Sequence, residues 1–214
     1  MEVKPIDTAQ LTRSRLEVTV IKMISPLLFL VHINNSKKNL EDLEEELEFR
    51  MSRKAKYLHC WPEDIREDED VVVKENNTWR RGWIDSVNPD SNMVKICLGD
   101  YGREIWCPKG EIYYLEDRFK ELPWQVVACG LAYTGLKGHA QMWPDKTNEL
   151  CRILAEGHKG WINIVQPIRR GAALVKLTVQ GENYSGSYNL RDVLVQLGHA
   201  QVSKKVTVDV FPAV

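Results

Sequence analysis

The chain has 214 residues and a formal net charge of −1, from 29 basic and 30 acidic side chains. Charged residues make up 28% of the sequence and hydrophobic residues 43%, which excludes disordered and fibrous classes. This length suits one large domain or two small ones. Dedicated nucleic-acid-binding proteins usually carry an excess of basic residues that attracts phosphate backbones. Because the charge of this chain is balanced, RNA is not the expected partner.

Five cysteines are spread along the chain without a C-x-x-C pair. An odd number at wide spacing favours neither a disulfide framework nor a zinc site, and it fits a reducing, cytoplasmic compartment. No apolar run approaches the roughly 20 residues that a membrane-spanning helix needs. The first 14 residues contain no apolar signal core. We therefore expect a water-soluble protein with no membrane partner.

The first third of the chain predicts two strands and a long helix. Residues 16–21 and 27–33 are rich in apolar and β-branched side chains, and Ser25-Pro26 separates them as in a hairpin. The next apolar residues recur at near-helical spacing, at Leu40, Leu43, Leu47, Met51 and Leu58. The acidic stretch Glu41 to Glu48 resembles a docking surface for an arginine-rich peptide, but a solvated helix face is the simpler interpretation.

Short strand-like segments then alternate with turns rich in Asn, Asp, Gly and Pro. These segments are residues 71–73, 79–87, 93–98, 104–107 and 112–115. Strands of this number and length predict a small barrel. Residues 116–122 have helical character that Pro123 ends.

The last third returns to mixed elements. Residues 126–131, 161–165 and 173–179 are strand-like. Thr147 is expected to cap a helix that Gly157 ends, and Asn189 to cap a second helix that Gly198 ends. The order β-β-α, small barrel, β-α-β-β-α predicts one β-rich domain inserted into, or clasped by, a second domain made from both ends of the chain.

The most specific stretch runs Trp79-Arg80-Arg81-Gly82-Trp83-Ile84 and continues, after a gap, as Leu98-Gly99-Asp100-Tyr101-Gly102-Arg103-Glu104. Together these segments resemble the Tudor barrel, whose turn has the form Asp-Tyr-Gly. Gly102 would supply the positive φ that such a turn needs.

The resemblance to extended Tudor domains covers roughly residues 15–201. In that family a split staphylococcal-nuclease-like domain of the OB type surrounds the barrel. Its further landmarks here are residues 122–131 and 189–200. The resemblance implies a β-rich α+β fold with a Tudor β-barrel inserted in that split domain. The implied parts are an N-terminal tail (1–14), the first part of the nuclease-like domain with its helix (15–62), the Tudor barrel (63–115), a linker helix (116–123), the second part of the nuclease-like domain (124–202) and a C-terminal tail (203–214).

The usual ligand of this family is symmetrically dimethylated arginine, held by four aromatic rings and an Asn or Asp. Carrying that pattern over places Val73, Arg80, Leu98 and Tyr101 at the ring positions and Arg103 at the Asn position. Only Tyr101 is aromatic, and the two arginines bring charge of the same sign as the ligand. The sequence therefore predicts an incomplete cage with little preference for methylated arginine.

Peptide binding is then expected to use unmodified arginine and the carboxylates of Asp100 and Glu104, with Tyr101 and Trp83 as further candidates. Trp79 and Trp83 lie four residues apart on one predicted strand and so point the same way. Because tryptophan buries a large area, packing in the barrel core or an interface is the favoured role for both.

The resemblance implies a non-catalytic module that binds the arginine-rich N-terminal tails of PIWI-clade Argonaute proteins in the piRNA pathway. It also implies other granule proteins as partners, and gene silencing in cytoplasmic, perinuclear germline granules. No cofactor is expected, because no catalytic, phosphate-binding or metal-binding motif is present and the catalytic residues of the nuclease are not recognisable. Two alternatives stay open: a single-stranded RNA-binding OB-type module, and a self-association scaffold with a vestigial Tudor site.

Overall fold

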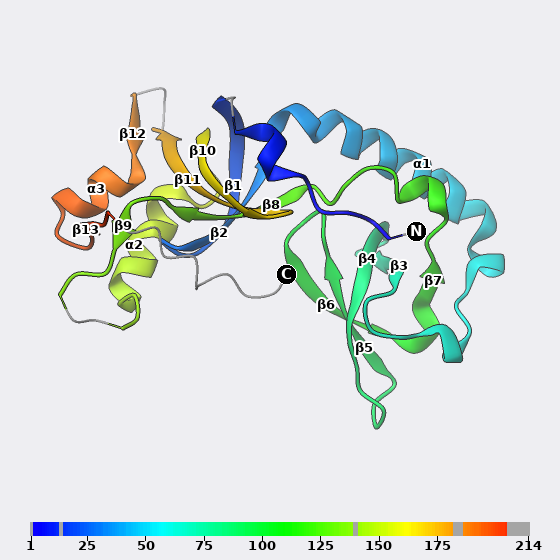
Figure 1. Cartoon of the computed structure of the whole chain (residues 1–214). Coiled ribbons are helices and arrows are strands. Elements are labelled where there is room, and N and C mark those ends of the chain that lie inside the picture. The colour runs from blue at the N-terminus through cyan, green and yellow to red at the C-terminus, as the bar shows by residue number, and fades with distance from the viewer. Residues whose placement is uncertain (1, 13–14, 139–140, 182–185, 205–214) are drawn as a thin grey trace. The chain divides into compact units, whose positions relative to one another are not determined.

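The computed structural model describes residues 2–12, 15–138, 141–181 and 186–204 (Figure 1). The chain forms two units, and each unit is built from separated segments. Met1–Pro5 and Ser36–Gln125 form the first, which we call the helix-barrel unit. Ile6–Asn35 and Val126–Val214 form the second, which we call the closed-sheet unit. The last residues of the predicted C-terminal tail, 205–214, lie outside the described residues.

The helix-barrel unit contains a five-stranded antiparallel sheet in the order β6-β5-β4-β3-β7. β4 pairs with β3 along its first half and with β5 along its second half, with a bulge between Ile84 and Ser86. In β5 every second side chain is buried, so that Val94, Ile96 and Leu98 face the interior. The strands are β3 (Asp70–Glu75), β4 (Thr78–Val87), β5 (Met93–Leu98), β6 (Arg103–Pro108) and β7 (Ile112–Tyr114), close to the predicted segments.

Helix α1 (Lys37–Leu58) belongs to the same unit and packs against β4 and β7. Leu47 and Met51 share a hydrophobic cluster with Trp79 of β4 and with Phe119. This differs from the predicted division, which assigned residues 15–62 to the other domain. Sequence periodicity shows that this helix has an apolar face, but it does not show which sheet covers that face.

Two predicted boundary segments are also part of the helix-barrel unit. The linker helix expected at residues 116–123 is only the short 3-10 turn η5 (Asp117–Phe119), in which Phe119 is buried. In the predicted N-terminal tail, Val3 is buried and its N–H donates a hydrogen bond of 2.7 Å to Asp70. The other 3-10 turns are η1 (Thr8–Leu11), η2 (Asn34–Ser36), η3 (Pro62–Asp64) and η4 (Lys109–Glu111).

The closed-sheet unit contains a six-stranded sheet in the order β10-β1-β2-β8-β11-β12. Because β10 pairs with both β1 and β11, five of these strands close into a barrel, the arrangement of an OB-type fold. In the described part of this sheet, β8 and β11 pair in parallel and the other neighbouring strands are antiparallel. The strands are β1 (Arg15–Ser25), β2 (Leu28–Ile33), β8 (Val126–Leu131), β10 (Lys159–Arg169), β11 (Ala172–Gln180) and β12 (Ser187–Asn189), and β9 (Thr134–Gly135) pairs with β13 (Gln201–Val202) in a separate small sheet.

Two helices pack on the core of this unit. In α2 (Asp145–Ala155), Pro144 stands at the N-cap, so the prediction that Thr147 caps the helix is wrong. Thr147 is buried inside the first turns, and its hydroxyl lies 3.1 Å from Nδ1 of His199. In α3 (Leu190–Gln196), the predicted cap is confirmed, because the Asn189 side chain accepts a hydrogen bond from the N–H of Asp192.

The five cysteines are free thiols, and four of them are buried. Burial raises the pKa of Cys60, Cys97 and Cys151 to about 12, so these thiols stay protonated and unreactive at neutral pH. Within the described residues, no helix is both long enough and apolar enough to cross a membrane.

Candidate functional site

The turn between β5 and β6 places Tyr101 at one end of the barrel. The backbone N–H groups of Tyr101 and Gly102 each donate a hydrogen bond of 2.9 Å to the carbonyl of Leu98. Gly102 has a φ of 63°, which confirms the predicted left-handed turn position. The turn therefore fixes the Tyr101 ring beside the last residue of β5.

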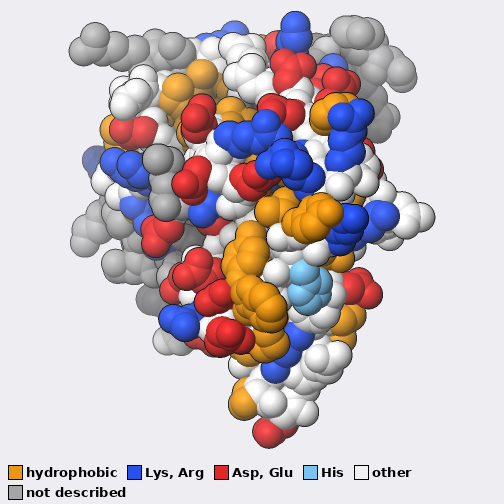
Figure 2. Space-filling view, turned by 90° about the vertical axis from the view of Figure 1, so that its right-hand side faces the viewer, with side chains coloured by type: hydrophobic (Ala, Val, Ile, Leu, Met, Phe, Trp, Pro, Cys, Tyr) orange, Lys and Arg blue, Asp and Glu red, His pale blue; other side chains and the backbone are white. Residues whose placement is uncertain are grey.

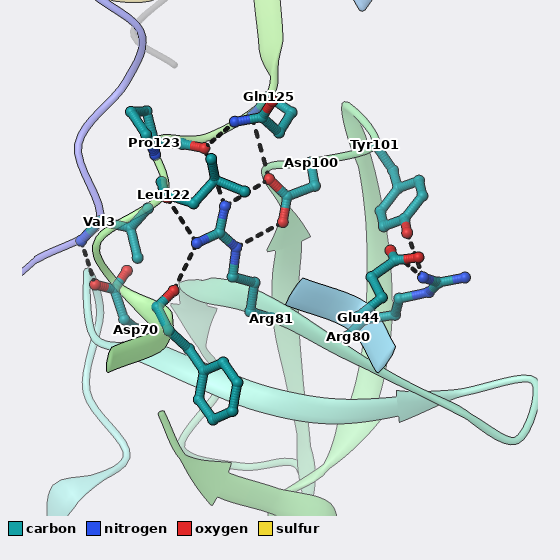
Figure 3. A network of polar contacts seen from close by, with 11 residues as sticks. Val3, Glu44, Asp70, Arg80, Arg81, Asp100, Tyr101, Leu122, Pro123 and Gln125 are labelled. Atoms are coloured by element: carbon teal, nitrogen blue, oxygen red, sulfur yellow. Dashed lines mark hydrogen bonds and ion pairs between the residues drawn. The ribbon is translucent and has the colours of Figure 1, made fainter. Parts of the chain in front are cut away.

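Two arginines of the chain lie against the Tyr101 ring. The guanidinium carbon of Arg80, on β4, is 4.5 Å from the ring centroid, and that of Arg103, on β6, is 5.2 Å away. Arg80 also donates hydrogen bonds to Glu44 of α1 and to the Tyr101 hydroxyl (Figure 3). Arg103 donates to Glu75 of β3 at 2.5 Å. These five residues, which we call the Tyr101 site, form a guanidinium-binding arrangement of one ring and two carboxylates.

The structure brings the five predicted cage positions together. Val73 is the register partner of Arg80 across β3 and β4, and Leu98 is the partner of Arg103 across β5 and β6. Both Val73 and Leu98 are fully buried in the barrel core, with an exposed fraction of 0%. Val73 and Leu98 therefore belong to the barrel core against which Tyr101 packs, and they present no surface to a ligand. Tyr101 is the one aromatic residue among the five positions.

Asp100 does not face a peptide, contrary to the prediction. It is only 2% exposed, and its carboxylate accepts two hydrogen bonds from Arg81, at 2.7 and 2.9 Å. The N–H of Gln125 donates a third, at 3.1 Å. Arg81 is 1% exposed and also donates to the carbonyls of Phe119, Leu122 and Pro123 (Figure 3). The Arg81–Asp100 pair therefore holds the segment that follows the barrel against the turn.

Trp83 also has a packing role, which agrees with the favoured interpretation of its sequence position. Its ring lies 5.2 Å from that of Trp124. A Cβ on Gly99 would lie 2.5 Å from atoms of both rings, so this glycine lets the turn approach the two tryptophans closely. Trp79 and Trp83 pack in the same hydrophobic cluster, as their spacing of four residues predicted.

Glu104 is paired with a lysine on the outer face of the barrel. The Lys95 ammonium lies 2.8 Å from Glu104 and 3.1 Å from Asp85, and these hydrogen bonds raise the pKa of Lys95 to about 12. The ligand atoms of Asp85, Cys97 and Glu104 lie within 4.8 Å of one another, which is a metal-ligand spacing. Because both carboxylates already pair with the single Lys95 ammonium, we assign Glu104 to this ion pair and not to the Tyr101 site.

Sequence reasoning missed the two carboxylates of the Tyr101 site. Glu44 lies in the acidic stretch that was interpreted as a solvated helix face. Its position four residues after Leu40 and three before Leu47 puts it at the edge of the buried face of α1, and this spacing could have identified it. Glu75 gives no comparable signal, because its partner Arg103 is far away in the sequence.

The fold and the barrel site can be compared with known proteins. A family model described as the Tudor domain matches residues 11–133, more than half of the chain. No curated protein matches the sequence. Three solved structures illustrate the similarity of fold, at 19 to 20% sequence identity.

An extended Tudor domain of mouse TDRD1, in complex with a MILI peptide containing dimethylarginine, has a TM-score of 0.75 at 19% identity and covers 88% of this chain and 93% of that one. The extended Tudor domain of Drosophila melanogaster Papi has a TM-score of 0.72 at 20% identity and covers 88% and 99%. A point variant of that Papi domain, in complex with an unmethylated N-terminal Piwi peptide, has a TM-score of 0.69 at 19% identity with the same coverage.

The predicted fold class, a β-rich α+β fold with a Tudor barrel in a split OB-type domain, is therefore confirmed. The matched family model includes β3 to β7 and the whole Tyr101 site. The chain belongs to the Tudor domain family and has the fold of an extended Tudor domain.

Proposed function

We propose that this protein is a non-catalytic interaction module that binds unmethylated, arginine-containing segments in the N-terminal tails of PIWI-clade Argonaute proteins. Two similar structures support the ligand class, because one contains a MILI peptide and the other a Piwi peptide. The observation that carries the proposal is the Tyr101 site, where guanidinium groups of the chain already stack on the ring and pair with Glu44 and Glu75.

The balance of interactions at this site favours unmodified arginine. A hydrogen bond to a charged group contributes about 1.5 to 3 kcal/mol, whereas a cation–π contact with one exposed ring contributes about 0.5 to 1 kcal/mol. Methylation keeps the charge of the guanidinium but removes N–H donors, so that it weakens pairing with carboxylates. With one ring in place of four, stacking does not compensate for that loss.

An incoming arginine reaches Tyr101 by exchanging with one of the chain's own arginines. The side chain of Arg103 is 49% exposed and that of Arg80 is 19% exposed. Arg103 is therefore the more accessible of the two arginines, although its partner Glu75 is only 13% exposed, and we propose that the Arg103–Glu75 pair is the one that opens. Glu75 then accepts the N–H groups of the ligand while Arg80 stays on the other side of the site.

The same proposal extends to where the protein acts in the cell. Resemblance to the family supports a role in piRNA-dependent gene silencing within perinuclear germline granules in the cytoplasm, alongside other granule proteins. Such a module acts as a scaffold that holds an Argonaute protein through its tail.

Calorimetry with paired arginine-containing tail peptides tests the proposed ligand. We expect the unmodified peptide to bind at least as tightly as its symmetrically dimethylated form, and we expect Tyr101→Ala or Glu75→Ala to weaken binding about tenfold or more. Trp106→Ala is the matched control, because Trp106 is an exposed aromatic residue of β6 outside the site. Tighter binding of the methylated peptide would refute the preference, and no binding of either peptide would refute the function.

A further inference from the structure

An aromatic side chain is exposed in the middle of helix α1. Phe49 is 56% exposed, although the same helix buries Leu47 and Met51. At about 100° per residue, Phe49 lies on the side of the helix opposite those buried residues. Figure 2 shows hydrophobic side chains exposed among charged ones on one face of the helix-barrel unit. A single exposed aromatic residue is common on protein surfaces and does not by itself mark an interaction site, so it is the charged residues around Phe49 that indicate one.

Charged residues flank Phe49 in a symmetric order along this outer face. Asp42 and Glu45 precede it by seven and four residues, and Arg53 and Lys56 follow it by four and seven. These spacings keep all five side chains on one side of a helix, and all five are exposed. We call this set the α1 outer face. Its first half is acidic and its second half is basic.

The helix macrodipole does not account for this order. A macrodipole stabilises acidic side chains only within the first turn of a helix. The first turn of α1 contains no acidic residue and begins instead with Lys37 and Lys38. Lys56 lies in the last turn, where the macrodipole favours a basic side chain, but Asp42, Glu45 and Arg53 lie outside the end turns, where the effect of the helix ends is weak.

The α1 outer face also has few partners inside the chain. Among the described residues, no ion pair involves its four charged side chains, and Arg53 stacks 3.9 Å from the Phe49 ring centroid. The other glutamates of the helix differ. Glu41 pairs with Lys37, Glu44 with Arg80 and Glu46 with Arg118, and Glu48 accepts the N–H of Trp79. Asp42 and Glu45 differ from these glutamates because they have no ion pair among the described residues.

We propose that the α1 outer face binds the same face of a second copy of this chain, with the two helices antiparallel. A two-fold axis through Phe49 relates the two copies. A residue that follows Phe49 by a given number of positions then faces the residue that precedes Phe49 by the same number in the second copy. Arg53 then meets the second copy's Glu45, and Lys56 meets the second copy's Asp42. Each pairing occurs twice, around two stacked Phe49 rings. A parallel arrangement would place like charges together.

The α1 outer face is small, which limits the affinity of the proposed dimer. From residue 42 to residue 56 the helix rises about 21 Å, so the face is one narrow helical stripe, small beside the roughly 800 Å² per partner that a standard interface buries. The dimer is therefore expected to be weak and dependent on concentration. Because the contacts are exposed ion pairs, added salt is expected to weaken it further.

Sedimentation equilibrium of the intact chain and of charge-reversal variants tests the pairing. Glu45→Arg alone and Arg53→Glu alone are each expected to weaken self-association at least tenfold, because each variant places like charges in contact. An equimolar mixture of the two variants is expected to associate again, since the substituted position 45 of one copy then faces the substituted position 53 of the other. Phe49→Ala is expected to weaken association as well.

Trp106→Ala is the matched control. Trp106 is a 59% exposed aromatic residue of β6 and is not part of the α1 outer face. This variant is expected to associate like the unmodified chain. The proposal is wrong if the unmodified chain stays monomeric at its highest soluble concentration, if self-association survives both charge reversals, or if the mixture of variants stays monomeric. Peptide binding at the Tyr101 site does not enter this measurement.

Discussion

Asp100→Ala is expected to lower the free energy of unfolding by about 3 to 5 kcal/mol, because it removes one partner of a buried ion pair. Arg81 would keep its charge while only 1% exposed, and it would lose two of its five hydrogen bonds. The N–H of Gln125 would lose its carboxylate acceptor as well. Urea unfolding, followed by tryptophan fluorescence, measures this change.

The control for this variant is Asp85→Ala, which removes a carboxylate from an exposed ion pair. Asp85 has a side chain 37% exposed and pairs with Lys95 at 3.1 Å, so its loss is expected to change stability by no more than about 0.5 kcal/mol. If Asp100 contacted a peptide instead of Arg81, its replacement would leave the urea midpoint unchanged and would reduce peptide affinity alone. That result would contradict the structural role assigned to the pair.

Gly160→Ala is expected to destabilise the closed-sheet unit by about 1 to 3 kcal/mol or more, because no space exists for a side chain there. A Cβ at this position of β10 would lie 2.3 Å from the carbonyl oxygen of Thr178 on β11. The obstacle is backbone, which cannot rotate away as a flexible side chain can. The strands would have to separate where β10 closes the barrel. Thermal and urea unfolding measure the loss.

Gly110→Ala provides the comparison, since a Cβ there meets nothing within 4 Å. Gly110 lies in the helix-barrel unit, and its φ is not in the left-handed region. Alanine is therefore expected to be neutral or slightly stabilising at this position. Equal stabilities of the two variants would show that the strands at Gly160 accommodate a methyl group, against the geometry described.

Local patterns in the sequence predicted most of the strands. The alternation that buries Val94, Ile96 and Leu98 is a property of consecutive residues, and it identified β5 directly. Asp100-Tyr101-Gly102 also has a local cause, since the turn needs a residue with positive φ after Tyr101. The short strands β9, β12 and β13 were missed, because their two or three residues contain no apolar run like the Val71-Val72-Val73 that identified β3.

Partners that are distant in sequence explain the errors at the site. A carboxylate next to Tyr101 is equally consistent with a peptide contact or a buried ion pair, and only the folded chain shows Asp100 enclosed with Arg81. The unit to which α1 belongs is a similar case, since its apolar face fits any apolar sheet. Glu75 was recognised as a site residue only when β3 was placed beside the turn, whereas the helical spacing of Glu44 was a sequence signal that was not used.

The path of the chain between its two units limits how this protein can be divided. Pro5 and Ile6, Asn35 and Ser36, and Gln125 and Val126 belong to different units, so the backbone passes from one unit to the other at three points. A fragment cut at residues 63–115 would lack α1 and Val3 and would expose the apolar surface that they cover. In evolution, exchange of the barrel alone by recombination would meet the same obstacle, so the whole extended domain is expected to be inherited as one unit.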